Sequence, residues 1–217
     1  MNWVDAVLGV LLLTAVIVGS KKGLVRESSA FLVFFAAIIL TVNYIDKLVI
    51  YIYDSLGTSV LVSAFLSFIL LLAGSYGLFK LLGYLFYQVA DIKGSKRRDQ
   101  MGGALVGFLR GWTAVGFLTF LMFLLPMPDR FYNDFEASFF GPTMAKTVPL
   151  IFDSTSMLHP NHPDFMAQIE NTLVTAPTQN STRGEELSEN RAEVFRVMYQ
   201  LDRFFRLSDE ADQKEGS

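Results

Sequence analysis

The chain has 217 residues, 52% of them hydrophobic, and a mean hydropathy of +0.38. Apolar residues in a soluble domain are scattered in short periodic runs, whereas here they are concentrated in residues 1–125. The sequence contains no cysteine, which excludes a disulfide framework, a thiolate metal site and a cysteine nucleophile.

The charge differs between the two parts of the chain. Residues 1–125 contain ten Lys/Arg and six Asp/Glu, a balance of +4. Residues 126–217 contain eight Lys/Arg and fifteen Asp/Glu, a balance of −7. Because nucleic-acid binding requires clustered basic residues, the acidic second part argues against a nucleic-acid partner.

Four apolar segments are long enough to cross a bilayer, which needs about 20 apolar residues in a helix. In chain order they cover residues 3–19, 28–45, 58–79 and 102–125. Pro126 and Pro128 end the fourth segment. The predicted fold class is therefore an all-α membrane protein. Residues 1–125 form a four-transmembrane-helix bundle, and residues 126–217 form a short helical and loop C-terminal tail.

The basic residues between the predicted spans suggest an orientation. They gather in the loops after the first and third spans (Lys21, Lys22 and Arg26; Lys93, Lys96, Arg97 and Arg98), whereas the middle loop sets Lys47 against Asp46 and Asp54. Basic loops are retained in the cytoplasm. We therefore expect the N-terminus and the tail to lie on the extracytoplasmic side of the membrane.

The tail contains two amphipathic patterns and a linker. Phe131, Phe135 and Phe139 recur every four residues, and a second apolar stripe lies between residues 190 and 208 (Val194, Met198, Leu201 and Phe205). We expect both segments to pack on each other or on the membrane surface, with a partner-binding helix as the alternative. Residues 175–189 have the composition of a linker.

Three stretches of the sequence resemble the colicin V production protein family. They are Met1-Asn2-Trp3-Val4-Asp5, Lys22-Gly23-Leu24-Val25-Arg26-Glu27, and the stretch from Asp99 to Gly111. The resemblance covers roughly residues 1–125. It implies a bacterial inner-membrane protein with four spans and a role in producing or exporting a toxin. Some relatives join such a membrane domain to an extracytoplasmic trypsin-like protease, but this tail contains no Gly-Asp-Ser-Gly stretch.

Small residues line one face of the fourth span. Gly103, Gly107 and Gly111 are spaced four apart and fall within about 80° on a helical wheel. Such a stripe lets another helix approach closely, so it predicts a helix–helix interface. The pattern leaves open whether the partner is another span or a second copy of the chain. Gly116 lies on the opposite side of the wheel, so Gly116→Leu is expected to be milder than Gly107→Leu.

Three charged residues are candidate intramembrane or interfacial sites. Arg110 lies on the glycine face, and a charge within a span is a functional hypothesis by default. It either extends to the headgroups or pairs with Glu27, which begins the second span at the same leaflet. Asp5 is expected to be a polar residue at the outer end of the first helix, where it complements the helix dipole, rather than an ion ligand.

No catalytic, cofactor-binding or metal-binding residue is predicted. His159 and His162 flank Pro160 and Asn161 in a loop without a suitable acidic partner, so a zinc site is not expected there. No histidine and no pair of aspartates lies in a span, which argues against an intramembrane protease.

The predicted function is that of a non-enzymatic membrane protein that supports toxin production or export, or the cell envelope. It would act in the lipid bilayer through membrane protein partners or self-association. The alternative is a small channel or transporter. Charge within the spans is scarce, and the sequence lacks the paired broken helices of many transporters.

Overall fold

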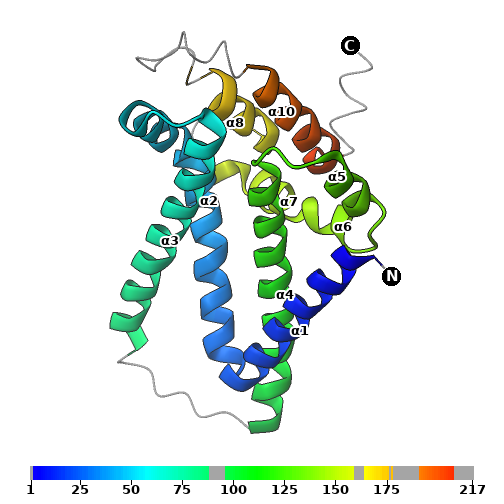
Figure 1. Ribbon diagram of the computed structural model, residues 1–217. Coiled ribbons are helices and arrows are strands. Elements are labelled where there is room, and N and C mark those ends of the chain that lie inside the picture. Colours follow the sequence, from blue (N-terminus) through cyan, green and yellow to red (C-terminus); the bar gives the residue numbers. More distant parts are fainter. Residues whose placement is uncertain (1, 88–95, 159–163, 176, 178–190, 208–217) are drawn as a thin grey trace.

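Four helices of the structure are long and apolar enough to cross a membrane (Figure 1). The computed structural model describes residues 2–87, 96–158, 164–175, 177 and 191–207. The long helices are α1 (Trp3–Lys22), α2 (Leu24–Leu56), α3 (Val60–Tyr87) and α4 (Lys96–Phe123). No strand occurs among the described residues, and the predicted all-α membrane fold class is confirmed.

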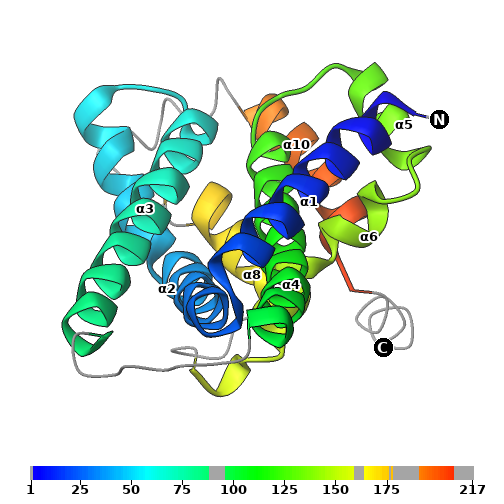
Figure 2. The same ribbon diagram turned by 90° about the horizontal axis from the view of Figure 1, so that it is seen from below.

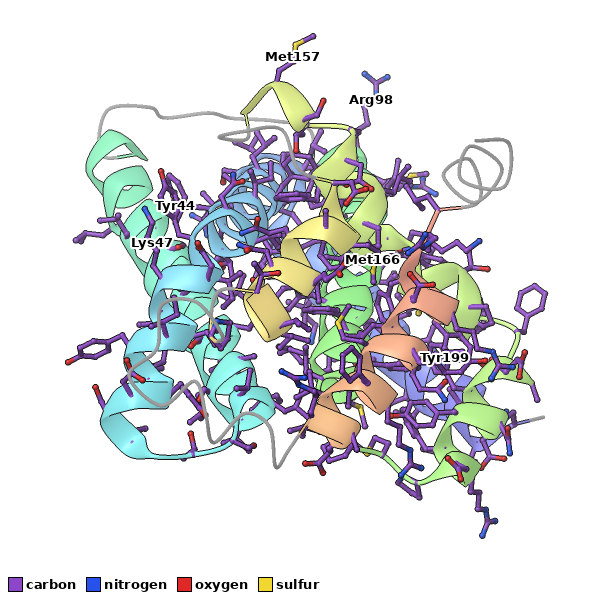
Figure 3. All side chains as sticks on the ribbon, turned by 90° about the horizontal axis from the view of Figure 1, so that it is seen from above. Tyr44, Lys47, Arg98, Met157, Met166 and Tyr199 are labelled. Carbon is purple, nitrogen blue, oxygen red and sulfur yellow. The ribbon has the colours of Figure 1, made fainter. Side chains whose placement is uncertain are left out.

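Helix α2 continues well past the predicted end of the second span at residue 45. The residues expected to form a loop, Asp46 and Lys47, lie inside the helix. Charged residues mark where a helix leaves hydrocarbon, but they do not break it, and Lys47 lies over the ring of Tyr44 at 5.3 Å (Figure 3). The helix ends at Gly57, whose φ of 64° is readily adopted by glycine.

The four long helices run alternately up and down, with α2 at the centre (Figures 1 and 2). Helix α1 packs antiparallel along the first half of α4, and α3 packs along α2. The C-terminal end of α1 and the N-terminal end of α4 lie together. This end of the bundle, called the basic end below, presents exposed basic side chains (Lys21, Lys22, Arg26, Arg97 and Arg98).

The second part of the chain folds over the other end of the bundle (Figure 1). Its described elements are α5 (Asp129–Glu136), α6 (Gly141–Ala145), α7 (Thr147–Asp153), η1 (Ser156–Leu158), α8 (Phe165–Glu170), the π-helical turn η2 (Asn171–Thr175) and α10 (Arg191–Phe205). Together they are called the cap. The cap and the long helices share one hydrophobic core, so the tail is structurally continuous with the bundle.

An aromatic cluster joins the end of α4 to the cap. Phe123 is fully buried, and its ring centroid lies 4.9 Å from that of Phe135 on α5 and 5.2 and 5.3 Å from those of Phe204 and Phe205 on α10. Tilted and edge-on ring pairs of this kind contribute beyond the area that they bury. The cap is therefore attached by apolar packing, which the acidic composition of the tail obscures.

The two predicted amphipathic patterns have different outcomes. In the stripe on α10, Val194, Leu201 and Phe205 are buried against the core. In the earlier pattern Phe135 is buried, but Phe139 lies beyond the end of α5 and is 81% exposed. Helix α5 ends at Glu136, so the four-residue spacing does not continue to residue 139. The predicted linker lies mostly outside the described residues.

Candidate functional site

A sharp turn connects α1 to α2 at the basic end. Gly23 has a φ of 85°, and its N–H donates to the carbonyl of Gly19 at 3.1 Å, which ends α1. The next N–H, that of Leu24, donates to Oδ1 of Asp99 on α4 at 2.8 Å. A side chain at Gly23 would overlap the Asp99 carboxylate. Asp99 thus satisfies an N–H at the start of α2 and ties α4 to the turn.

The partner of the glycine face on α4 is α1. A Cβ added at Gly107 would lie 2.8 Å from both the carbonyl oxygen of Ala15 and the Cα of Gly19. A Cβ at Gly103 would lie 2.8 Å from the carbonyl carbon of Gly23, and one at Gly111 would overlap the side chain of Ala15. The backbones of α1 and α4 approach so closely that there is no room for these side chains.

Gly116 does not have the free surroundings expected from the helical wheel. A Cβ at this position would lie 2.7 Å from the carbonyl oxygen of Met144 and 3.2 Å from Cβ of Thr147. The reason is that α6 and α7 pack against the side of α4 opposite α1, and Trp112 Nε1 donates to Thr147 Oγ1 at 2.9 Å. Two faces of α4 are therefore packed, so the wheel alone does not support a milder effect of Gly116→Leu than of Gly107→Leu.

Arg110 and Glu27 lie next to each other. Arg110 Nε is 2.7 Å from Glu27 Oε1, and Lys22 Nζ is 3.9 Å from Glu27 Oε2. The Glu27 side chain is fully buried, while those of Arg110 and Lys22 are 19% and 46% exposed. Within the described part of the chain, neither carboxylate oxygen accepts an aligned hydrogen bond, so the contact is an ion pair without directional hydrogen bonding. Arg110 was expected either to extend to the headgroups or to pair with Glu27, and the distance of 2.7 Å is that of a pair.

Helices α3 and α4 diverge toward the basic end (Figure 1). A groove beside Arg110 lies between them. Farther from that end the two helices meet through Phe68, whose ring centroid lies 4.9 Å from that of Phe120. The groove encloses about 440 Å³ and receives residues from all four long helices (Ala15; Phe34; Ile69, Leu72, Ala73 and Tyr76; Arg110, Gly111 and Ala114). Among the described residues that line it, only Arg110 and Tyr76 contribute polar side-chain atoms.

Asp5 lies far from this site and contacts the cap. Its Oδ1 accepts from the backbone N–H groups of Phe139 and Phe140 at 2.8 and 3.1 Å. Beside it Trp3 Nε1 donates to Asp134 Oδ2 at 2.7 Å. The side-chain amide of Asn2 donates to the carbonyl of Asp134. Asp5 is thus at the end of α1, as expected, and the structure adds its partner, the α5–α6 connection.

One residue of the site, Asp99, was not predicted to have a structural or functional role. Asp99 was noted only as the start of a stretch with a family resemblance, and a long-range cap of this kind leaves no local pattern in the sequence. Among the described residues no group of three or more metal-binding side chains occurs. His159, His162 and Lys93 lie outside the described residues.

The three stretches of sequence that carry the family resemblance form two junctions. The segments 22–27 and 99–111 meet at the basic end, and the N-terminal segment meets the cap. A family model described as Colicin V production protein matches residues 4–149, more than half of the chain. The chain belongs to this family.

The match to the colicin V production protein family extends farther than the resemblance near residues 1–125 indicated, since it reaches residue 149. It therefore includes α5, α6 and the start of α7. No curated protein and no solved structure matches the chain. Family and helices together identify a multi-pass membrane protein.

Proposed function

We propose that the protein is a non-enzymatic component of the inner membrane that supports toxin production or export by binding protein partners through its cap. This proposal is supported by the contacts of the polar side chains in the three stretches that resemble the family, because these contacts are made within the same chain. Asp5, Asp99 and the Arg110–Glu27 pair each contact another part of the same chain. Side chains engaged in this way hold the architecture together, which leaves the cap surface for recognition.

The outer side of α10 is the surface that we assign to a partner. Phe195 and Tyr199 are one helical turn apart and are 54% and 65% exposed, and Tyr199 projects from the cap in Figure 3. Aromatic side chains are enriched where proteins bind one another. Two ion pairs, Arg196 with Asp129 and Arg203 with Glu136, connect α10 to α5 at 2.6 Å each.

The orientation proposed with this function places the basic end in the cytoplasm. Exposed basic residues gather at that end, and the cap, which bears the acidic part of the chain, lies at the other. A cap outside the cytoplasm would meet an exported protein or an envelope component.

The partner surface can be tested by paired substitutions. Phe195→Ala with Tyr199→Ala should reduce toxin release from producing cells while leaving the membrane level of the protein unchanged. A photocrosslinker at residue 199 should give a protein adduct in native membranes. Tyr51→Ala is the matched control, since Tyr51 is a similarly exposed tyrosine (68%) on α2. Equal toxin release from both variants and the parent would contradict the assignment.

A small channel is the second candidate, and the groove beside Arg110 is the observation that favours it. Purified protein in liposomes distinguishes the two functions. Ion flux that depends on the protein would support the channel, whereas tight liposomes together with an adduct at residue 199 would support partner binding.

A further inference from the structure

The groove between α3 and α4 combines apolar walls with a cationic end. It encloses about 440 Å³, within the size range of small-ligand sites. Phe34 of α2 and Tyr76 of α3 meet edge-on across it, with ring centroids 6.4 Å apart. The remaining walls come from aliphatic side chains and from glycine and alanine. Hydrocarbon is the natural occupant of such a space in a bilayer, because water would find few hydrogen-bonding partners there.

The charges at the end of the groove favour an anion. Arg110 and Lys22 share the single carboxylate of Glu27, so the three side chains carry a formal balance of +1. Arg110 approaches Glu27 through Nε. In the described part of the chain, its two terminal amino groups have no hydrogen-bond partner and remain available to another acceptor. Guanidinium groups match the geometry of phosphate oxygens.

A freely diffusing ion fits this site poorly. The groove offers one cationic residue and a tyrosine hydroxyl, so a small anion would have to leave water for mostly apolar walls. An amphiphile matches both parts, since its tail can contact the walls while its anionic head contacts the cations. Basic pockets between membrane helices bind anionic lipid headgroups in this way.

We propose that the groove binds one anionic phospholipid from the leaflet at the basic end. An acyl chain lies between α3 and α4 against Phe34 and Ala73, and the phosphate contacts Arg110 and Lys22. The ion pair with Glu27 holds Arg110 at the mouth of the groove. This proposal is independent of the partner surface on α10, because it concerns the opposite end of the molecule.

Native mass spectrometry of the full-length protein tests the proposal. The protein is purified with phosphatidylglycerol or phosphatidylcholine of identical acyl chains, and the fraction that retains one lipid is measured. We expect phosphatidylglycerol to be retained at least about fivefold better. Lys22→Gln, at the exposed C-terminal end of α1, should lower this preference, and Arg110→Gln should abolish it.

Two bulky substitutions on α3 locate the lipid. Ala73→Phe fills the groove and should lower the fraction of protein that retains a lipid about tenfold. Gly74→Phe adds the same side chain at a neighbouring position that has open space around it, and it should leave this fraction unchanged. A wild-type protein that retains both lipids equally would refute the anionic headgroup. Retention of lipid in Ala73→Phe, or equal loss in both variants, would refute the location. Neither result would bear on toxin release through α10.

Discussion

The ion pair between Arg110 and Glu27 should behave as a coupled unit. Arg110→Ala removes the cation 2.7 Å from a fully buried carboxylate, and among the described residues it leaves only Lys22, at 3.9 Å, to compensate that charge. Leaving a buried charge without its partner costs about 3–5 kcal/mol. Glu27→Ala should cost less, because the side chain of Arg110 is 19% exposed and can turn toward the headgroups.

The double variant decides whether the two residues interact. Without either charge there is no uncompensated carboxylate, so the double variant should be no less stable than Arg110→Ala alone. The expected coupling free energy is about 2–3 kcal/mol, near the upper end of values for residues in contact. Reversible unfolding in mixed micelles of detergent and SDS measures the free energy of unfolding for all four proteins. Membrane levels in cells provide a second measurement.

Simple additivity of the two losses would refute this reasoning. It would mean that Arg110 spends its time at the headgroups and that Glu27 is compensated by other groups. Glu27→Gln is the control, because it removes the charge while keeping the side-chain volume. This variant should resemble Glu27→Ala if charge causes the effect. A charge swap at the two positions is less informative, since it moves a positive charge near the segment that sets orientation.

The other predictions concern packing, orientation and pH. Gly107→Ala should cost about 1–3 kcal/mol of stability by overpacking α1 against α4, whereas Gly77→Ala, which has open space around it, should have little effect in the same unfolding assay. Alkaline phosphatase fused after Ser217 should be active, and the same enzyme inserted at residues 93–98 should be inactive; the reverse would overturn the orientation. Burial raises the pKa of Tyr132 above its ordinary value of about 10. The stability that this neutral side chain provides is present below pH 10 and is lost as pH rises through its folded pKa. Cap unfolding, followed by tryptophan fluorescence, should therefore increase above pH 10 in the parent and less in Tyr132→Phe.

Much of the bundle can be predicted from the sequence because length and hydropathy alone define a helix that crosses a bilayer. The error at the end of α2 has a physical cause. Asp46 and Lys47 show where the chain leaves hydrocarbon, but an α-helix continues in water as long as no residue stops it. Gly57, which adopts a left-handed conformation, was the better signal for the helix end.

The interface between α1 and α4 could be predicted only from one side. The spacing of Gly103, Gly107 and Gly111 indicates that some backbone comes close, but the periodicity of one helix contains no information about its neighbour. The matching small residues on α1, Ala15 and Gly19, are one turn apart and provided a usable hint. The expectation for Gly116 assumed that α4 is packed on one face only, whereas the cap packs against the opposite face as well.

The sequence predicted least about the cap. Helix α4 connects the cap to the basic end of the bundle. This helix contributes Asp99 and Arg110 to the basic end and Phe123 to the aromatic cluster. At about 1.5 Å per residue, Asp99 and Phe123 are about 36 Å apart. Helix α1 also joins both ends, through Gly19 beside α4 and Asp5 beside the cap. Two rigid helices that are fixed at both ends make bundle and cap one cooperative unit. A partner that displaces the cap would therefore also strain the packing that positions Arg110 and its groove.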